Sequence, residues 1–556
     1  MLRYTCQVLG TGADGSTPCL LASVERVPLY GKKEEKVATV MARYLFNVGE
    51  GVARFAQEHG VKLPGIKKAF LCGTAADDAA GLPGLYLSLS SLGAPSLQLF
   101  GPRGVATLAS ATTELLQRRF PEVTAVPLEL DADESSACFE LEDDHFDIRA
   151  GVFDASRSAT ARHKRARDAR TQARPLALYH CRAKHGDRPS FLVVSCPSPA
   201  YIAALAAHPL FKEGATYIFH LAPTATVTCA AYAPLLAKSL GRHVVVNDGG
   251  RCQPPFAEDK PLQRDLLYLL GTGSAAPSKS RGCSGLLLKL AARSGSSSTK
   301  TGGGDAAAAP PLSLLMDAGE GTYGHLCRQF GAAGALAQLR ALDAIWISHK
   351  HADHMTGLWR LLCLRAGCSG GAAEEGGSGG AALPPLPVIA PETVLRWLTA
   401  CASVSPGHVA AEPLRFRDAR AAALHSAYEL RSVNATFDDA RAADAARKRH
   451  CTAGEALRVA RRMGARAAVL THFSQRYPRV PALAEGQSAA VAFDGMVVEL
   501  AAAARLREVT ALVCRVLTEG KERRGREGAP LEGGGGKGGG GDVSEGEAEA
   551  SEPCCH

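Results

Sequence analysis

The segment His349-Lys350-His351-Ala352-Asp353-His354 decides the fold, because it places three imidazoles and one carboxylate within six consecutive residues. It directly follows the apolar run 344–347 and Ser348, and a run of this length is typical of a short buried strand. Alternate residues of an extended chain point to the same side, so His349 and His351 are expected to face one way. Imidazole and carboxylate are good zinc ligands. The pattern therefore predicts two adjacent metal sites, an arrangement suited to phosphodiester hydrolysis.

A plainer interpretation of the same segment is a polar loop whose histidines are only solvated. Its position at the end of an apolar strand favours metal binding over that interpretation. A second strand, expected at 467–470, would deliver His472 at its carboxyl end. Before it, Thr452 and Glu455 form a T-x-x-E capping box, which predicts a helix that begins there and stops at Gly464.

The chain also contains an internal duplication. Four segments recur in the same order, while the loops between them change length: Leu9–Gly12 as Leu270–Gly273, Gly49–Gly51 as Gly319–Gly321, Phe70–Leu82 as Trp346–Leu358, and Ile218–His220 as Leu470–His472. Short apolar strands, Gly-rich turns and amphipathic helices in each copy predict an α/β fold. In the N-terminal copy Gly73 and Ala75 stand where His349 and His351 stand in the second, so no zinc is expected there.

The ligand string is the signature of the metallo-β-lactamase fold, and the motifs around it resemble those of the long-form tRNase Z family. Four segments carry this resemblance: 277–281 (P-x-K-x-R-N, with Gly282 for Asn), 315–322 (D-x-G-E-G-T), 450–452 (H-S-T) and 472–477 (H-F-S-Q-R-Y). The resemblance implies two tandem metallo-β-lactamase-like αββα sandwich domains. These are an inactive, tRNA-holding half without metal ligands at 1–257 and a catalytic half at 258–519. Disordered insertions are expected at about 292–310 and 367–385, and a disordered tail at 520–556.

The resemblance also assigns a role to each residue of the site. His349 and His351 would bind one zinc ion, and Asp353, His354 and His472 would bind the other. Asp353 would also act as the base for the attacking water, and His450 would help to protonate the leaving 3′ oxygen. Lys279 and Arg281 would hold phosphates, although an ordinary exposed basic loop is the plainer interpretation of those two. Asp317 is expected to shape the site without binding metal.

The function implied is that of a zinc-dependent endoribonuclease that removes the 3′ trailer from precursor tRNA and leaves a 3′ hydroxyl on the tRNA. A monomer is expected, because the duplication replaces a homodimer, and DNA is not an expected partner. Two alternatives stay open: a catalytically impaired RNA-binding relative, and another hydrolase of the same fold. The basic loop at 277–281, the motif at 472–477 and the duplication argue against the second alternative.

The sequence departs from the family pattern between Gly357 and His472. The family has a third histidine at the first zinc site, a bridging aspartate in an S-G-D-T turn and a glutamate in an H-E-A-T motif. Here Asn434 replaces that glutamate, His425 is a weak candidate for the histidine, and no S-G-D-T occurs. Either a block is missing from the coding sequence as given, or the chain is catalytically poor. The loss of several motifs together, with both flanks spared, favours the missing block.

Composition adds weaker constraints. Lys and Arg exceed Asp and Glu by 63 to 55, a net charge of +8 that permits a polyanionic partner without requiring one. The basic run 157–174 contains seven Lys or Arg and suits either RNA phosphates or a disordered loop.

The 17 cysteines include no paired CxxC motifs, which indicates a reducing compartment. No signal peptide and no apolar run of about 20 residues is evident, so an intracellular protein is expected. The nucleus is the first expectation, with mitochondrion or plastid as alternatives.

Overall fold

In the computed structural model, all described residues belong to one compact unit, Met1–Arg507. The described residues are 2–28, 38–117, 121–129, 138–154, 174–238, 240–247, 264–274, 277, 281–291, 311–367, 383–404, 411–415, 437, 439–447, 450–465, 467–474 and 489–505. The insertion expected at 292–310, most of that at 367–385, the tail from 520 and nearly all of the basic run lie outside these ranges. No helix in the described part of the chain is long and apolar enough to cross a membrane.

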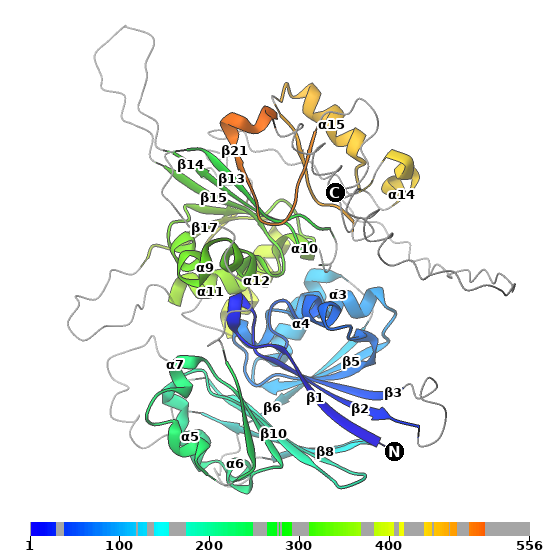
Figure 1. The fold of residues 1–556 in the computed structure, drawn as a ribbon, viewed down its shortest axis with the longest axis vertical. Coiled ribbons are helices and arrows are strands. Elements are labelled where there is room, and N and C mark those ends of the chain that lie inside the picture. Colours follow the sequence, from blue (N-terminus) through cyan, green and yellow to red (C-terminus); the bar gives the residue numbers. More distant parts are fainter. Residues whose placement is uncertain are drawn as a thin grey trace, which may run out of the picture. The chain divides into compact units, whose positions relative to one another are not determined.

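Two six-stranded sheets form the N-terminal half (Figure 1). The first sheet has the order β1 (Leu2–Gly10), β2 (Cys19–Arg26), β3 (Thr39–Phe46), β4 (Ile66–Phe70), β5 (Ser96–Pro102), β6 (Glu122–Leu128). The second has the order β12 (Arg242–Val246), β11 (Tyr217–Leu221), β10 (Ser190–Ser195), β9 (Leu176–Ala183), β8 (Phe146–Phe153), β7 (Cys138–Glu142). In the first sheet β1, β2 and β3 are antiparallel, and β3 to β6 are parallel.

Aromatic side chains fill the layer between these two sheets. The Phe70 ring stacks between Phe46 and Phe100, with centroid distances of 5.1 and 4.9 Å. Tyr179 and Phe191 of the second sheet pack onto Phe46 from the opposite side. Helices cover the outer faces: α1 (Val52–Glu58), α2 (Ala76–Ala79), α3 (Leu82–Ser91) and α4 (Val105–Leu116) on the first sheet, α5 (Ile202–Ala207), α6 (Pro209–Glu213), α7 (Thr224–Val227) and α8 (Ala233–Leu236) on the second. The expected αββα layering is confirmed for this half.

The C-terminal half repeats the order and direction of the first sheet, which confirms the duplication. The repeated strands are β13 (Leu266–Gly271), β14 (Gly285–Leu290), β15 (Leu312–Ala318), β16 (Ala344–Trp346), β17 (Leu386–Ile389) and β18 (Ala411–Leu414), with β21 (Met496–Glu499) added beside β13. The helices of this half are α9 (Thr322–Arg340), α10 (Ala352–Met355), α11 (Leu358–Gly367), α12 (Glu392–Val404), α14 (Ala442–Arg447) and α15 (Ala453–Arg462).

The second sheet of this half contains two described strands, β19 (Val469–Leu470) and β20 (Ala490–Val491), with α15 packed on them. In the N-terminal half the strands β7 to β10 follow β6 before the segment that carries β11. The corresponding interval here, residues 415–436, contains fewer residues than those four strands alone. The length of this interval agrees with the block that the sequence indicated as missing, and both His425 and Asn434 fall in the part that is not described.

The two Gly-Glu-Gly motifs join the halves by a reciprocal exchange of hydrogen bonds. The backbone N–H of Gly51 donates to Glu320 Oε1 at 3.0 Å, and that of Gly321 donates to Glu50 Oε1 at 2.7 Å. Each glycine is the N-cap of a helix and has a positive φ, 90° at Gly51 and 86° at Gly321, a conformation that favours glycine. Each glutamate therefore satisfies a free N–H at the start of the other half's helix. Burial, with Glu50 nearby, raises the pKa of Glu320 to about 7.

Candidate metal centre

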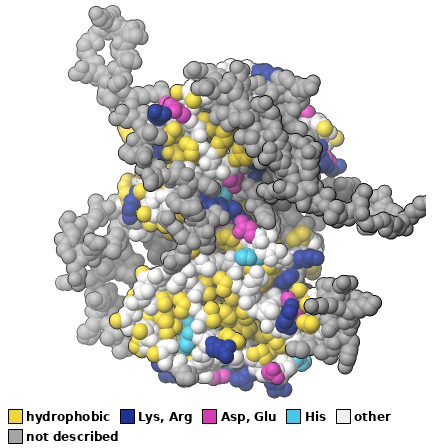
Figure 2. All heavy atoms as spheres, viewed as in Figure 1, with side chains coloured by type: hydrophobic (Ala, Val, Ile, Leu, Met, Phe, Trp, Pro, Cys, Tyr) yellow, Lys and Arg dark blue, Asp and Glu magenta, His cyan; other side chains and the backbone are white. Residues whose placement is uncertain are grey.

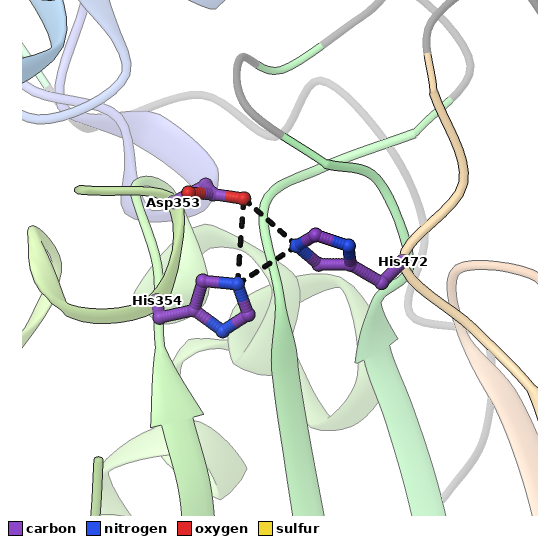
Figure 3. A group of neighbouring side chains, drawn as sticks. All are labelled: Asp353, His354 and His472. Carbon is purple, nitrogen blue, oxygen red and sulfur yellow. Dashed lines mark hydrogen bonds and ion pairs between the residues drawn. The ribbon is translucent and has the colours of Figure 1, made fainter. Parts of the chain in front are cut away.

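Three side chains from two distant segments converge on one point, as Figure 3 shows. Asp353 and His354 lie in α10, which begins shortly after β16 ends, and His472 follows β19. His354 Nε2 lies 2.8 Å from His472 Nε2. Asp353 Oδ2 lies 3.0 Å from His472 Nε2 and 3.4 Å from His354 Nε2. The structure thus brings together the three residues that were predicted to share one metal.

This group is enclosed by protein: Asp353 is 6% exposed, and His354 and His472 are 1% exposed each. One candidate ligand atom from each residue lies within 4.8 Å of the others. Burial lowers the pKa of His354, but the carboxylates of Asp353 and Asp317 outweigh burial and raise it overall. The site therefore favours positive charge near these carboxylates.

Asp317 fixes the orientation of the His354 ring. His354 Nδ1 donates to Asp317 Oδ2 at 2.6 Å, and the backbone N–H of Ser348 donates to Asp317 Oδ1 at 2.8 Å. With its proton on Nδ1, a neutral His354 presents the lone pair of Nε2 to Asp353 and His472. Lone pairs and a carboxylate oxygen converging in a buried space form a donor set that fits a divalent cation. The predicted role of Asp317, shaping the site, agrees with this geometry.

The other predicted pair, His349 and His351, adjoins this group. His349 Nε2 lies 3.0 Å from His351 Nδ1, and the His349 ring centroid is 4.0 Å from that of His354. Burial and the neighbouring histidines lower the pKa of His349 to about 3, so the ring is neutral and able to bind metal at ordinary pH. The described residues offer this pair no third ligand of the kind found beside His354. The assignment of these two histidines to a second zinc ion stays a prediction.

His450 lies beside the same group, close to the N-terminus of α15. Its ring centroid is 5.9 Å from that of His472. The predicted capping box is present: Thr452 Oγ1 accepts from the Glu455 N–H, and the Glu455 carboxylate accepts from the Thr452 N–H. The helix ends at Arg462, just before Gly464, as expected. Burial, with His472 next in effect, lowers the pKa of His450 to about 4.

Of the two residues expected to bind phosphate, the structure describes only Arg281. Lys279 lies outside the described residues. Arg281 is only 3% exposed, and its guanidinium donates to Thr272 Oγ1 at 2.7 Å and to the Ala492 carbonyl at 2.9 Å. A guanidinium enclosed in this way faces protein, so a direct phosphate contact by Arg281 has no support in this placement. Among the residues drawn in colour in Figure 2, the Lys and Arg side chains lie in separate groups.

Several residues around the site were missed by sequence reasoning. Asp494 accepts hydrogen bonds from Thr272 and from the Gly282 N–H, at 2.5 Å for the latter. Gly282 stands where the family motif has Asn, and a Cβ at this glycine would clash with the buried ring of His325. The replacement of Asn by Gly was visible in the sequence, but nothing in the sequence pointed to His325 as its neighbour.

The corresponding region of the N-terminal half is held by ordinary hydrogen bonds. Asp78 Oδ1 accepts from Asn47 Nδ2 at 3.0 Å, and a Cβ at Gly73 would clash with Asp78. Burial raises the pKa of Asp78 to about 7. The ring of His220 lies 2.9 Å from the Tyr232 hydroxyl and 2.8 Å from His243 Nδ1. Both ring nitrogens of His220 are thus engaged within the protein, as expected for a structural histidine.

Comparisons with known proteins agree with this arrangement. The family model described as tRNase Z endonuclease matches residues 37–81. A mitochondrial tRNase Z of Arabidopsis thaliana is 37% identical over 147 residues, which cover 26% of this chain and 14% of that protein. The mitochondrial ribonuclease Z of Drosophila melanogaster is 28% identical over 306 residues, which cover 44% of this chain and 36% of that protein.

The crystal structure of a long form RNase Z from yeast matches this fold with a TM-score of 0.68 at 15% identity, over 92% of this chain and 99% of that one. At that identity the match establishes the fold alone. The curated relatives above are matched over 14% and 36% of their own lengths, so this chain spans about a third of them or less. The chain is thus similar in sequence to tRNase Z and ribonuclease Z proteins over part of its length, and its tandem α/β architecture is that of the long form RNase Z structure.

Proposed function

We propose that this protein is a zinc-dependent endoribonuclease that removes the 3′ trailer from precursor tRNA and leaves a 3′ hydroxyl on the tRNA. The observation that carries the proposal is the convergence of Asp353, His354 and His472 in the fold of a long-form RNase Z. Relatives named tRNase Z and ribonuclease Z support the substrate. We further propose that the metal is zinc, and that residues 258–519 carry the catalytic site while residues 1–257 help to hold the RNA.

In this proposal each residue has a stated task. Asp353, His354 and His472 hold one zinc ion, and His349 and His351 hold a second. Zinc ions bound in such a pair supply a strong nucleophile at neutral pH and stabilise the charge on phosphate oxygens. Asp317 keeps the His354 proton on Nδ1, so that Nε2 faces the ion. Burial of Asp353, His354 and His472 limits the access of competing water to the first ion.

Two residues move protons in the proposed reaction. The Asp353 carboxylate takes a proton from the attacking water, and His450 gives a proton to the leaving 3′ oxygen. The pKa of His450 near 4 disfavours its charged form in the protein alone. A bound phosphodiester would bring negative charge beside the ring and raise that pKa, which would allow His450 to act as an acid.

The proposal is tested with the purified full chain and a precursor tRNA that carries a short 3′ trailer. Cleavage is expected to give a 3′ hydroxyl on the tRNA and a 5′ phosphate on the trailer, to stop on chelation and to return with added zinc. His354→Ala and Asp353→Asn should each lose activity and bound zinc, whereas His59→Ala, at an exposed histidine remote in sequence from the motif, should retain both. Cleavage that persists after complete metal removal would contradict the proposal.

Two observations favour a second candidate, a catalytically impaired RNA-binding relative. The described residues place no third ligand beside His349 and His351, and residues 415–436 are too few for the strands found in the other half. Precursor tRNA bound tightly but never cut, by metal-loaded protein, would favour this candidate.

For location, similarity supports the mitochondrion, because the Arabidopsis and Drosophila relatives are named as mitochondrial. The nucleus, which was the first expectation, has no such support and stays a prediction. Imaging the tagged full chain would distinguish these compartments.

A further inference from the structure

His472 is held in a strained backbone conformation. Its φ of 67° lies in the left-handed region, which residues other than glycine seldom adopt. Such a conformation persists only where the surroundings enforce it. The groups that anchor the chain around His472 therefore help to decide where its imidazole points.

The anchor is the next residue, Phe473, which is fixed to the loop after β13. The Phe473 N–H donates to the Thr272 carbonyl at 2.9 Å, and the Phe473 carbonyl accepts from the Ser274 N–H at 3.0 Å. The guanidinium of Arg281 lies over the Phe473 ring, 4.9 Å from its centroid. Backbone and ring of Phe473 are thus held by different parts of the same loop.

Arg281 is joined to Asp494 through the hydroxyl of Thr272. That hydroxyl accepts from Arg281 Nη1 at 2.7 Å and donates its one hydrogen to Asp494 Oδ1, also at 2.7 Å. Arg281 Nη1 also donates to the Ala492 carbonyl at 2.9 Å. Because Ala492 directly follows β20, the partner of β19, the same guanidinium ties the loop to the small sheet that delivers His472.

We infer that Arg281 is a positioning residue for the metal ligand His472, acting through Phe473, Thr272 and Asp494 and not by contacting RNA phosphate. The inference rests on the metal-binding role proposed for His472. It assigns to Arg281 the same kind of task that Asp317 performs for His354: fixing a ligand ring from outside the metal site.

The test measures Co²⁺ binding to the metal-free full chain by visible absorption, which needs no RNA and no catalysis. His472→Ala identifies the part of the signal that belongs to this site. Arg281→Gln and Thr272→Val should each weaken Co²⁺ binding at this site about 10–100-fold. The double variant should bind Co²⁺ about as tightly as the single variant with the lower affinity, because the two residues act as one unit. Arg365→Gln, at another buried arginine of this half, should lower thermal stability without changing Co²⁺ affinity.

A second measurement separates positioning from phosphate binding. The salt dependence of precursor-tRNA binding should be the same for Arg281→Gln as for the unaltered chain, whereas loss of one phosphate contact would reduce the slope by about one. The inference is wrong if that slope falls, or if Thr272→Val binds Co²⁺ as tightly as the unaltered chain. A chain that binds Co²⁺ normally but cuts no RNA would contradict the proposed function and leave this inference intact.

Discussion

Asp317 holds the Nδ1 side of the His354 ring. It accepts from His354 Nδ1 at 2.6 Å and from the Ser348 N–H at 2.8 Å, and it holds a φ of 59° itself. Asp317→Ala is expected to weaken zinc binding about 10–100-fold, because the ring loses the partner that fixes its tautomer. Competition with a chromophoric chelator measures this affinity. The matched control is Asp343→Ala. The Asp343 carboxylate accepts from the N–H of Ser313, which lies at the other end of β15. Equal zinc affinities in the two variants would contradict the prediction.

The sequence predicted the residues of the candidate metal site better than the residues that support them. Asp353 and His354 were predicted from their spacing. His472 was predicted from the strand before it and from its occurrence together with the other motifs. Arg281 was expected at the surface, either bound to phosphate or in an ordinary exposed basic loop. In the structure Arg281 is buried and donates to Thr272, whose hydroxyl donates to Asp494, 222 residues away in the chain. Local pattern carries no signal for a contact of that kind.

Helix α15 is the element that places His450 beside the candidate metal centre. Thr452→Ala removes the side-chain acceptor for the Glu455 N–H and should lower the free energy of unfolding by about 1 kcal/mol. Fraying of this turn should also slow the chemical step, because His450 precedes the cap by two residues. Denaturant unfolding and single-turnover cleavage measure the two effects.

Thr399→Ala in α12 is the control for the cap. The Thr399 hydroxyl donates to the Leu395 carbonyl within the helix, an interaction that contributes little to stability. Stability and cleavage should therefore stay close to those of the unaltered chain. If both threonine variants behave alike, the cap does not position His450.

Elements with a complete local signal were predicted closely, and the others were not. The apolar run 344–347 became β16, and the capping box and Gly464 bounded α15 within two residues. The second sheet of the C-terminal half had no such signal, because β19 and β20 contain two residues each. So short a strand is defined by its partner, and pairing across residues 471–489 cannot be read from periodicity.

At the scale of the whole molecule, the duplication was visible in the sequence but the contact between the copies was not. Aligning Glu50 with Glu320 shows that the motifs are equivalent, yet it does not show that each caps the other's helix. The copies have also diverged at this contact. Arg360 donates to Glu50, Asp77 and two backbone carbonyls of the N-terminal half, whereas the equivalent position there is Gly84, packed against Glu320. Asp77, which corresponds to the proposed metal ligand Asp353, therefore binds an arginine of the C-terminal half.

Because Arg360 compensates the buried carboxylate of Glu50, Arg360→Ala should lower the free energy of unfolding by roughly 3–5 kcal/mol. Replacing Glu50 as well, in Arg360→Ala/Glu50→Gln, should recover part of that loss, since no uncompensated charge would remain. Arg396→Ala is the matched control: its ion pair with Glu114 also joins the halves, but both side chains are more than half exposed, so a loss of about 0–1 kcal/mol is expected. Denaturant unfolding of the full chain measures all three. Similar losses for Arg360→Ala and Arg396→Ala would show that the stability of the chain does not depend on this buried contact.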